Sequence, residues 1–325
     1  MEFIQDVVTQ TRTLSGPLSG PTGVRPAGMS DAVILSRRWG ERPPVARSPL
    51  RERFQDLGLA YVLSEADSAR LSKSIAVVRR LLKFALGSEI QGLRLIGSHV
   101  RHTRVAPHFD DQACVDGLVC FRSDRRPPDA CVALIAHVME AWLPSDFIDV
   151  YRDSVEIDMM GHRLRLIPGQ QTRDGQLHVA GLSRNPEAGT RPWIPFDPDG
   201  TAAAVRDSDS RHSNLITPVI RILKTWNIHA GRPFTGFELE EAVLGQRFRS
   251  TRQITFMTLE AMAGLPEPKQ RSASVHTTLK DLKTAAREAA ALERTRRFPE
   301  AMDVMTPHLM PERAVGAHPL LTGFS

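Results

Sequence analysis

The strongest constraint on the fold is a set of strand-like segments in the first half of the chain. The sequence LRLIGS at residues 93–98 is a short apolar run that ends in a Gly-Ser turn, and ACVDGLVCF at 113–121 is dense in apolar and small residues. SVEIDMM at 154–160 and HRLRLIP at 162–168 are separated by Gly161, which is the spacing of a hairpin. These segments predict two strands followed by a β-hairpin.

Helical patterns surround these strands. Ser64 and Asp67 have the spacing of a capping box, which predicts a helix start. The apolar residues that follow share one helical face: Leu71, Ile75, Val78 and Leu82. Asp129 is expected to cap a second helix over residues 130–142.

After residue 168 the sequence changes to long loops and helical patterns, which predicts an all-helical second half. Residues 214–226 carry an apolar stripe, and Pro218 either opens this helix or kinks it. Thr235 and Glu238 can form the capping box of the next helix. Residues 275–297 are strongly helical by composition.

Cysteine content and charge narrow the class of protein. Three cysteines with no CxxC pair, Cys114, Cys120 and Cys131, favour a reducing cytosol over secretion. The first residues lack the apolar region of a signal peptide, and no run of about 18 apolar residues occurs, so a cytoplasmic protein without a membrane span is expected. The net charge of +5 fits a phosphate-bearing partner but does not identify one.

The Gly97-Ser98 turn has a physical basis for binding phosphate. Glycine lets the backbone approach closely, the following amides point outward, and Ser98 adds a hydroxyl donor. Two residues alone are far more typical of an ordinary strand-to-helix turn. The combination is more specific: GSHVRHT, a strand some ten residues later, a hairpin ending in RLIP, and IRILKTWN occur in a fixed order.

Together these motifs resemble the CD-NTase family of cyclic-oligonucleotide synthases, which includes bacterial dinucleotide synthases, cyclic GMP-AMP synthase and oligoadenylate synthase. The resemblance covers residues 64–260 and implies an α+β, bilobal nucleotidyltransferase fold of the polymerase-β-like type. In that fold a mixed β-sheet core with helices is joined to a C-terminal α-helical lobe. Three parts are therefore expected: a mostly irregular Pro, Gly and Arg-rich arm (1–55), a nucleotidyltransferase core (56–170) and a C-terminal helical domain (171–325).

The resemblance also implies site residues and partners. Gly97 and Ser98 match the turn that grips the triphosphate, Thr103 the structural threonine after it, and Lys224 the helix lysine that reaches the phosphates. It implies a nucleoside triphosphate as substrate or ligand, Mg²⁺ or Mn²⁺ if the protein is active, and a partner protein in an antiviral signalling system. For Lys224 an ordinary solvated cation on a helix is the alternative.

The departures from the family pattern concern the metal site. Two-metal nucleotidyl transfer uses carboxylates at i and i+2 of a strand, which share one face. The matching positions are Cys114 and Asp116, or Ala113 and Val115 in a second register, so at most Asp116 remains as a catalytic metal ligand. The third carboxylate position carries Arg165, whose fixed positive charge repels a metal ion.

Two other metal sites are conceivable from the sequence. A rearranged carboxylate site would combine Asp116, Asp158 and Asp111, with Glu156 and Asp110 nearby; the alternative is that these acids are solvent-facing polar residues. A zinc site would combine His99, His102, His108 and Cys114. As a nucleophile, Cys114 lacks the nearby base and electropositive setting that a reactive thiol needs.

Three functional hypotheses follow. The leading one is a pseudoenzyme with a nucleotidyltransferase fold that binds nucleotide, RNA or a partner protein. The second is an active cyclic-nucleotide synthase with a remodelled metal site. The third is RNA or DNA binding through the basic arm, for which a solubilising tail is the alternative. The arginines concerned are Arg37, Arg38, Arg42, Arg47, Arg51 and Arg53.

Overall fold

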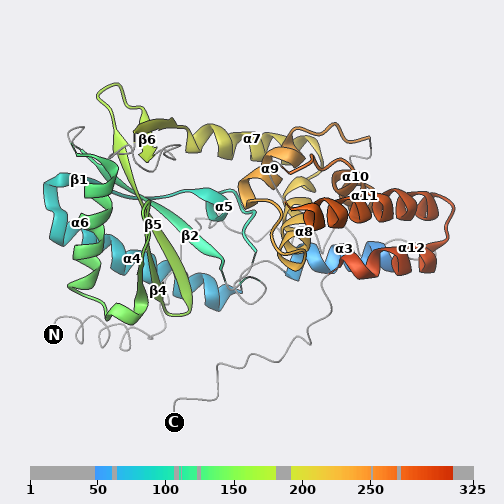
Figure 1. Cartoon of the computed structure of the whole chain (residues 1–325), viewed down its shortest axis with the longest axis horizontal. Helices are drawn as coiled ribbons and strands as arrows, with labels where there is room; N and C mark the ends of the chain where they lie inside the picture. The colour runs from blue at the N-terminus through green and yellow to red at the C-terminus, as the bar shows by residue number, and fades with distance from the viewer. Residues whose placement is uncertain are drawn as a thin grey trace, which may run out of the picture. The chain divides into compact units, whose positions relative to one another are not determined.

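A computed structural model of the chain describes the following residues: 48–60, 64–105, 110, 112–122, 126–180, 192–249, 252–268 and 272–309. They belong to one compact unit, Ala46–Ser325, in which a sheet with its helices is followed by a helical lobe (Figure 1). Several predicted residues lie outside the described ones: Arg37, Arg38, Arg42, Arg47, His108 and Asp111.

A seven-stranded mixed sheet forms the first half, as predicted. Its strands are β1 (Ile90–Leu95), β2 (Cys114–Phe121), β3 (Ile148–Val150), β4 (Val155–Met159), β5 (His162–Gln171), β6 (Leu177–Ala180) and β7 (Trp193–Phe196). The order is β1-β2-β5-β4-β3, and β6 pairs with β5 and with β7. Strands β2 and β5 run parallel, whereas the other pairs are antiparallel.

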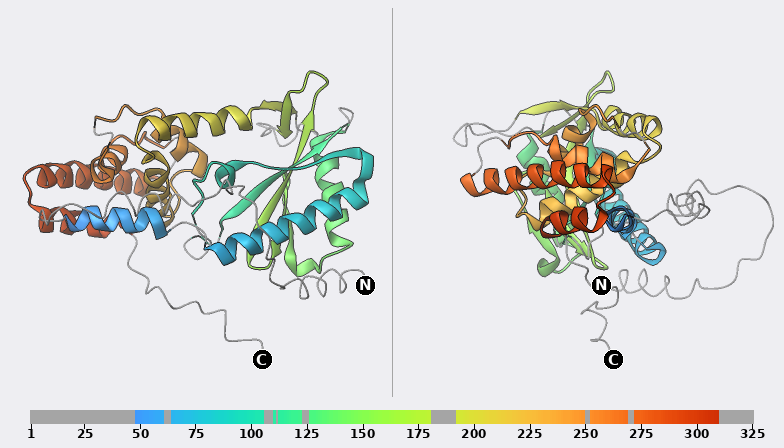
Figure 2. Two further views of the ribbon diagram at one scale, coloured as in Figure 1. Left: turned by 180° about the vertical axis from the view of Figure 1, so that it is seen from behind. Right: turned by 90° about the vertical axis from the view of Figure 1, so that its right-hand side faces the viewer.

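Two helices, α4 (Glu65–Leu86) and α6 (Pro128–Glu140), cover one face of this sheet (Figures 1 and 2). Because side chains alternate along a strand, the buried residues Val115 of β2 and Leu164 of β5 face these helices. The polar residues between them face the other way. The opposite face of the sheet is therefore where the candidate site lies.

The predicted caps of these two helices had different outcomes. Ser64 caps α4 and accepts a hydrogen bond from the Asp67 N–H at 3.1 Å, as predicted. Asp129 does not cap α6, because the helix begins at Pro128 with Pro127 as the N-cap residue. The fixed φ of proline suits the first helical position, so the helix starts before the aspartate.

The prediction that the chain is all helical after residue 168 is wrong, because β6 and β7 extend the sheet. Strand β5 continues through Pro168 to Gln171. Along one side of β5 the pairing with β4 stops at Leu166, and the pairing with β6 begins at Gly169. Pro168 falls in the gap between these two partners, where its missing N–H costs least.

Six helices of the described residues form the helical lobe after the sheet: α7 (Pro198–Arg211), α8 (Ile216–His229), α9 (Gly236–Leu244), α10 (Ile254–Ala263), α11 (Ala273–Arg294) and α12 (Phe298–Met305). Helix α8 begins at Ile216, so Pro218 opens this helix within its first turn and does not kink it. Thr235 and Glu238 form the predicted capping box of α9. No described helix is long and apolar enough to cross a membrane.

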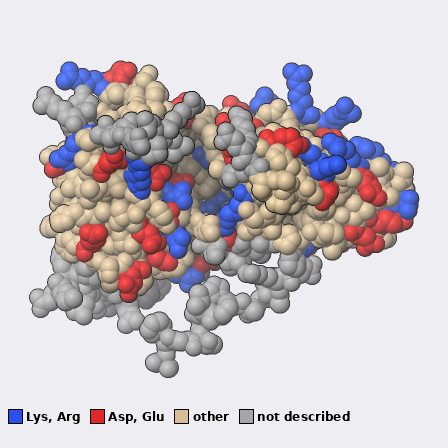
Figure 3. Space-filling model, viewed as in Figure 1, with Lys and Arg blue, Asp and Glu red and all other residues tan. Residues whose placement is uncertain are grey.

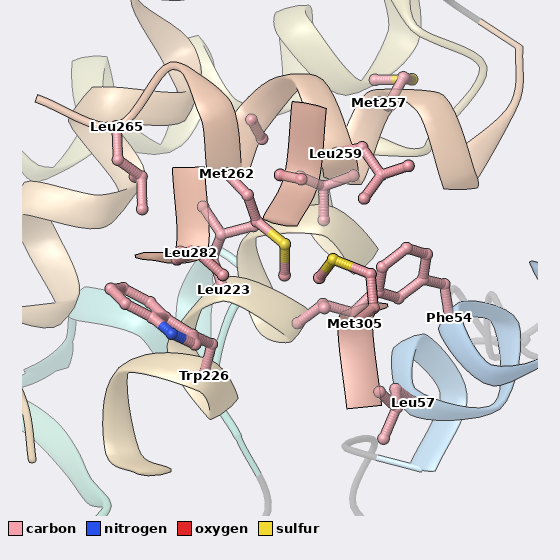
Figure 4. Packing of buried hydrophobic residues seen from close by; sticks show 14 of the residues in the cluster. Phe54, Leu57, Leu223, Trp226, Met257, Leu259, Met262, Leu265, Leu282 and Met305 are labelled. Carbon is pink, nitrogen blue, oxygen red and sulfur yellow. The ribbon is translucent and has the colours of Figure 1, made fainter. Parts of the chain in front are cut away.

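Helix α3 (Pro49–Ala60) packs into the core of the helical lobe, although its sequence falls where the arm and the nucleotidyltransferase core were expected to meet. Leu50, Phe54 and Leu57 form one face of this helix and are buried. Figure 4 shows Phe54 and Leu57 beside Met305 and near Met262. Ser48 caps the helix and also donates to Glu293 of α11 at 2.5 Å.

Candidate functional site

The Gly97-Ser98 turn and Asp116 lie directly against each other. The short helix α5 (Gly97–Val100) starts where β1 ends, and Gly97 has a positive φ of 74°. A Cβ atom at Gly97 would lie 2.4 Å from Oδ2 of Asp116, so both the backbone and the close approach require glycine here. The structure therefore brings the predicted phosphate turn and the predicted metal ligand together.

Three strands place acids and arginines in two rows on the open face of the sheet. Asp116 of β2 lies opposite Arg165 of β5, which lies opposite Glu156 of β4. In the neighbouring row Arg163 separates Cys114 from Asp158. Val115 is fully buried among the apolar residues on the other face, so the alternative register with Ala113 and Val115 is wrong.

The guanidinium group of Arg165 lies among the side chains that would have to hold a metal ion. Its Nε donates to Oε1 of Glu156 at 2.8 Å, its Nη1 is 3.7 Å from Oδ1 of Asp116, and its Nη2 is 3.9 Å from Sγ of Cys114. Burial disfavours its charge, but Asp116 and Glu156 outweigh burial and raise the pKa of Arg165 above its ordinary value. We call Asp116, Arg165 and Glu156 the sheet cluster.

The donor set of the sheet cluster does not fit Mg²⁺ or Mn²⁺. Burial raises the pKa of the Asp116 carboxyl, and burial also raises the pKa of the Cys114 thiol to about 12, so the thiol stays protonated at neutral pH. Hard divalent cations take several oxygen ligands, whereas here a guanidinium fills the space between the two carboxylates. Within the described residues, no group of three His, Cys, Asp or Glu side chains is arranged to hold a metal ion.

The two alternative metal sites gain no support from the described residues. Asp158 is exposed, and Arg163 of β5 lies between it and Cys114. Asp110 forms a salt bridge with Arg232 at 2.6 Å. Burial and the neighbouring Arg104 lower the pKa of His99 to about 4, so this imidazole is neutral at pH 7. The remaining partners of both sites, Asp111 and His108, lie outside the described residues.

A second charged cluster joins the turn to the helical lobe. Glu240 of α9 accepts hydrogen bonds from Nε of Arg101, from the hydroxyl of Thr103 and from Nζ of Lys224, each at 2.5 Å. Its side chain is only 1% exposed. We call Arg101, Thr103, Lys224 and Glu240 the lobe cluster.

Lys224 lies next to the turn, but its ammonium group is fully engaged. Nζ contacts Glu240 and also the carbonyl and hydroxyl oxygens of Thr103, at 3.2 and 3.3 Å. These three partners match the three donors of an ammonium group. Burial lowers the pKa of Lys224, and Glu240 opposes this effect. Contact between Lys224 and phosphate therefore remains a prediction that requires this network to open.

Sequence reasoning missed Glu240 and Phe237, which lie one turn apart on α9. Burial alone would raise the pKa of Glu240, but Lys224 and Arg101 outweigh it and the pKa lies below its ordinary value. The Phe237 ring is 47% exposed, and the Arg101 guanidinium lies 5.9 Å from its centre. The available signal was the pattern of the capped helix, because Phe237 and Glu240 follow the Thr235 cap at helical spacing.

The surface is hollowed between the sheet and the helical lobe, and Lys and Arg side chains border this hollow (Figure 3). The lobe cluster links the two sides of this region, since Arg101 and Thr103 follow the Gly97-Ser98 turn and Glu240 belongs to the lobe. We refer to the region between the sheet cluster and the lobe cluster as the cleft. It brings together all five predicted site residues, Gly97, Ser98, Thr103, Asp116 and Lys224.

Comparison with solved structures identifies the fold. CdnG, a CD-NTase of Bradyrhizobium diazoefficiens solved in complex with GTP, superimposes with a TM-score of 0.61 at 12% identity, over 82% of this chain and 99% of that one. CdnC of E. coli MS115-1, solved in complex with HORMA-deltaN, gives 0.56 at 11% identity, over 82% of this chain and 99% of that one. CdnE, a c-di-GMP synthase from Capnocytophaga granulosa, gives a TM-score of 0.56 at 13% identity, over 79% of this chain and 90% of that one.

The chain therefore has the CD-NTase-like nucleotidyltransferase fold that its motifs predicted. No protein-family model and no curated protein matches the sequence. Identities of 11–13% establish the architecture alone. What this chain does has to be argued from its own residues.

Proposed function

We propose that this chain is a nucleotide-binding protein that has the CD-NTase fold but does not catalyse metal-dependent nucleotidyl transfer. One observation carries the proposal: the Arg165 guanidinium lies between Asp116 and Glu156, where a catalytic metal ion would need carboxylate oxygens. Arginine keeps its charge at all accessible pH values, so the position is permanently cationic. A divalent ion placed there would be repelled.

The same arginine supports phosphate binding without a metal. Guanidinium groups recognise phosphate oxygens through paired N–H donors, and 41% of the Arg165 side chain is exposed. The Gly97-Ser98 turn lies on the other side of Asp116. A phosphate group beside this turn would have a fixed positive charge nearby in place of a metal ion.

Phe237 supports recognition of the base. An exposed aromatic ring beside an arginine is a surface on which a nucleobase can stack, and such stacking contributes about 1–3 kcal/mol per base. Its neighbour on α9, Glu240, contacts the segment that follows the turn. Phosphate and base would thus be held by groups on the two sides of the cleft.

Calorimetry with a non-hydrolysable ATP analogue tests the proposal. We expect binding in EDTA that changes less than about threefold when Mg²⁺ is added. Arg165→Gln should weaken binding about tenfold, a cost of about 1.4 kcal/mol. The control Arg163→Gln, on the same strand and face, should have little effect. Phe237→Ala should weaken binding of the analogue but not of tripolyphosphate.

A turnover assay tests the alternative that the protein is an active cyclic-nucleotide synthase. Purified protein is incubated with labelled nucleoside triphosphates and Mg²⁺ or Mn²⁺, and we expect no metal-dependent product. Robust product that disappears in Asp116→Ala would overturn the proposal. The antiviral signalling role that the motif resemblance implies stays a prediction, as does a partner protein; the HORMA protein is a partner of CdnC.

Nucleic-acid binding by the arm also stays a prediction, and the fold improves its test. Arg51 and Arg53 lie on α3, whose apolar face is part of the lobe core. Deleting residues 1–55 would therefore remove core residues as well as arginines. A deletion of 1–45 leaves Ala46–Ser325 intact, and unchanged RNA and DNA binding by that variant would exclude this part of the arm as the binding element.

A further inference from the structure

We infer that Glu240 determines which nucleotides the cleft accepts, favouring those with a single phosphate group or a phosphodiester over nucleoside triphosphates. This inference rests on the proposed nucleotide binding and specifies its ligand. Its basis is that the cations beside the phosphate turn are already neutralised by protein carboxylates. A ligand with a large negative charge therefore finds few free positive charges there.

The lobe cluster supplies the main evidence. Lys224 and Arg101 are two of the cations that flank the segment after the turn, and both are bound by the single carboxylate of Glu240. The Arg101 and Glu240 side chains are 8% and 1% exposed, so water does not substitute for either partner. Separating these charges to bind a ligand would be strongly unfavourable because a buried carboxylate would lose its partners.

The lobe cluster is also rigidly connected to the turn. The Arg101 N–H donates to the carbonyl of Gly97 at 3.2 Å, and the Thr103 N–H donates to the carbonyl of Ser98 at 2.9 Å. The Thr103 hydroxyl then donates to Glu240 at 2.5 Å. The negative charge of Glu240 is thus held close to the position where a phosphate chain would extend from the turn.

The remaining charges of the cleft lead to the same conclusion. Asp116 and Glu156 share Arg165. Arg104 is buried and donates to the carbonyl of Ala113 at 3.1 Å, while its Nε and Nη1 have no hydrogen-bond partner. One guanidinium with unused donors matches one phosphate group. A triphosphate carries more charge, which nucleotidyltransferases and kinases neutralise with metal ions.

Calorimetry with AMP and ATP in EDTA tests the inference. We expect the wild-type protein to bind AMP at least as tightly as ATP. Glu240→Gln frees Lys224 and Arg101 while keeping the shape of the side chain, and it should raise the affinity for ATP about tenfold relative to AMP. Lys224→Gln should shift the ratio in the opposite direction, because it leaves the charge of Glu240 less compensated. Glu241→Gln is the matched control, since it removes an exposed glutamate one residue away.

The outcomes separate this inference from the proposal on which it rests. Thermal unfolding first identifies which variants are folded, and the opposite signs expected for the Glu240 and Lys224 variants keep the inference testable if either one fails to fold. The inference would be overturned if the proteins bind nucleotide but the ratio of the AMP affinity to the ATP affinity is the same in the wild-type protein and in the folded Glu240 or Lys224 variant. The proposed function would still stand in that case. No binding of either nucleotide to any folded variant would overturn both.

Discussion

The sheet cluster and the lobe cluster both pair carboxylates with cations around one cleft, but they differ in how far water reaches them. In the lobe cluster the Lys224 and Glu240 side chains are 10% and 1% exposed. In the sheet cluster the Arg165 and Asp116 side chains are 41% and 24% exposed. Glu156, the third member of the sheet cluster, is buried with a side chain 7% exposed, so water reaches this cluster only at Arg165 and Asp116. Loss of a partner is therefore expected to cost more stability in the lobe cluster, and the sheet cluster is expected to affect mainly ligand binding.

The largest expected effect is the loss of the shared carboxylate of the lobe cluster. Glu240→Leu leaves Lys224 and Arg101 as buried charges without their shared carboxylate, and the free energy of unfolding should fall by about 3–5 kcal/mol. Arg165→Met in the sheet cluster should lower it by less than Glu240→Leu does, because Arg165 is 41% exposed, although the buried Glu156 loses its nearest cation. Urea unfolding of both variants measures the contrast. Equal losses would show that exposure does not distinguish the two clusters.

The lobe cluster also marks the limit of what the sequence could predict. The motif order identified the Gly97-Ser98 turn, Asp116 and Lys224, and the structure brings all of them to one cleft. The density of apolar and small residues was sufficient for β2, and the spacing around Gly161 was sufficient for the hairpin of β4 and β5. Glu240 was missed because two of its three partners are 137 and 139 residues away along the chain, so the helical pattern alone does not show that its carboxylate is buried among cations.

Two predictions about the fold were wrong, and the physical causes are of the same kind. Residue Pro168 indicated the end of a strand, yet β5 continues because two different partners flank it there. The Arg-rich sequence around α3 concealed the i, i+4, i+7 spacing of Leu50, Phe54 and Leu57. In both cases the deciding neighbour is distant in sequence. The local sequence predicts the secondary structure that a segment favours alone, whereas contacts with distant residues determine where the segment ends and packs.

A pH titration extends the comparison to His99, which directly follows the Gly97-Ser98 turn on α5. Its pKa is lowered to about 4 by burial and by Arg104, so it is neutral in the folded state while the unfolded chain takes up a proton near pH 6.5. The unfolded state binds more protons in this window, so stability falls as the pH drops from about 6.5 to 4, by up to about 3 kcal/mol. Urea unfolding at several pH values measures this slope.

The matched variants are His99→Gln and His137→Gln. His99→Gln should reduce the slope between pH 6.5 and 4, to which the buried His162 also contributes, whereas the replacement of the exposed His137 should leave the slope unchanged. An unchanged slope in His99→Gln would mean that other buried groups cause the pH dependence.

A smaller effect is expected when the carboxylates of the sheet cluster are restored. The double substitution Cys114→Asp and Arg165→Asp adds two carboxylates near Asp116. It also removes the guanidinium that contacts both Cys114 and Asp116. We expect the affinity for Mn²⁺ to rise about tenfold or more over the wild-type protein, which is about 1.4 kcal/mol. Calorimetry with Mn²⁺ measures it. Cys114→Asp alone retains Arg165 and should not gain affinity, and equally tight binding by the wild-type protein would contradict the role assigned to Arg165.

The smallest expected effect concerns the cap of α9, the helix that carries both Phe237 and Glu240. Thr235→Ala removes the side chain that accepts the Glu238 N–H at 3.1 Å, and about 1 kcal/mol of stability should be lost. Ser64→Ala, at the cap of α4, is the matched control and should lose a similar amount. Fraying of α9 loosens the helix that holds the lobe cluster, so only Thr235→Ala should also change nucleotide affinity, by up to about threefold in calorimetry. A change of the same size in Ser64→Ala would mean that general stability, and not the position of α9, controls binding.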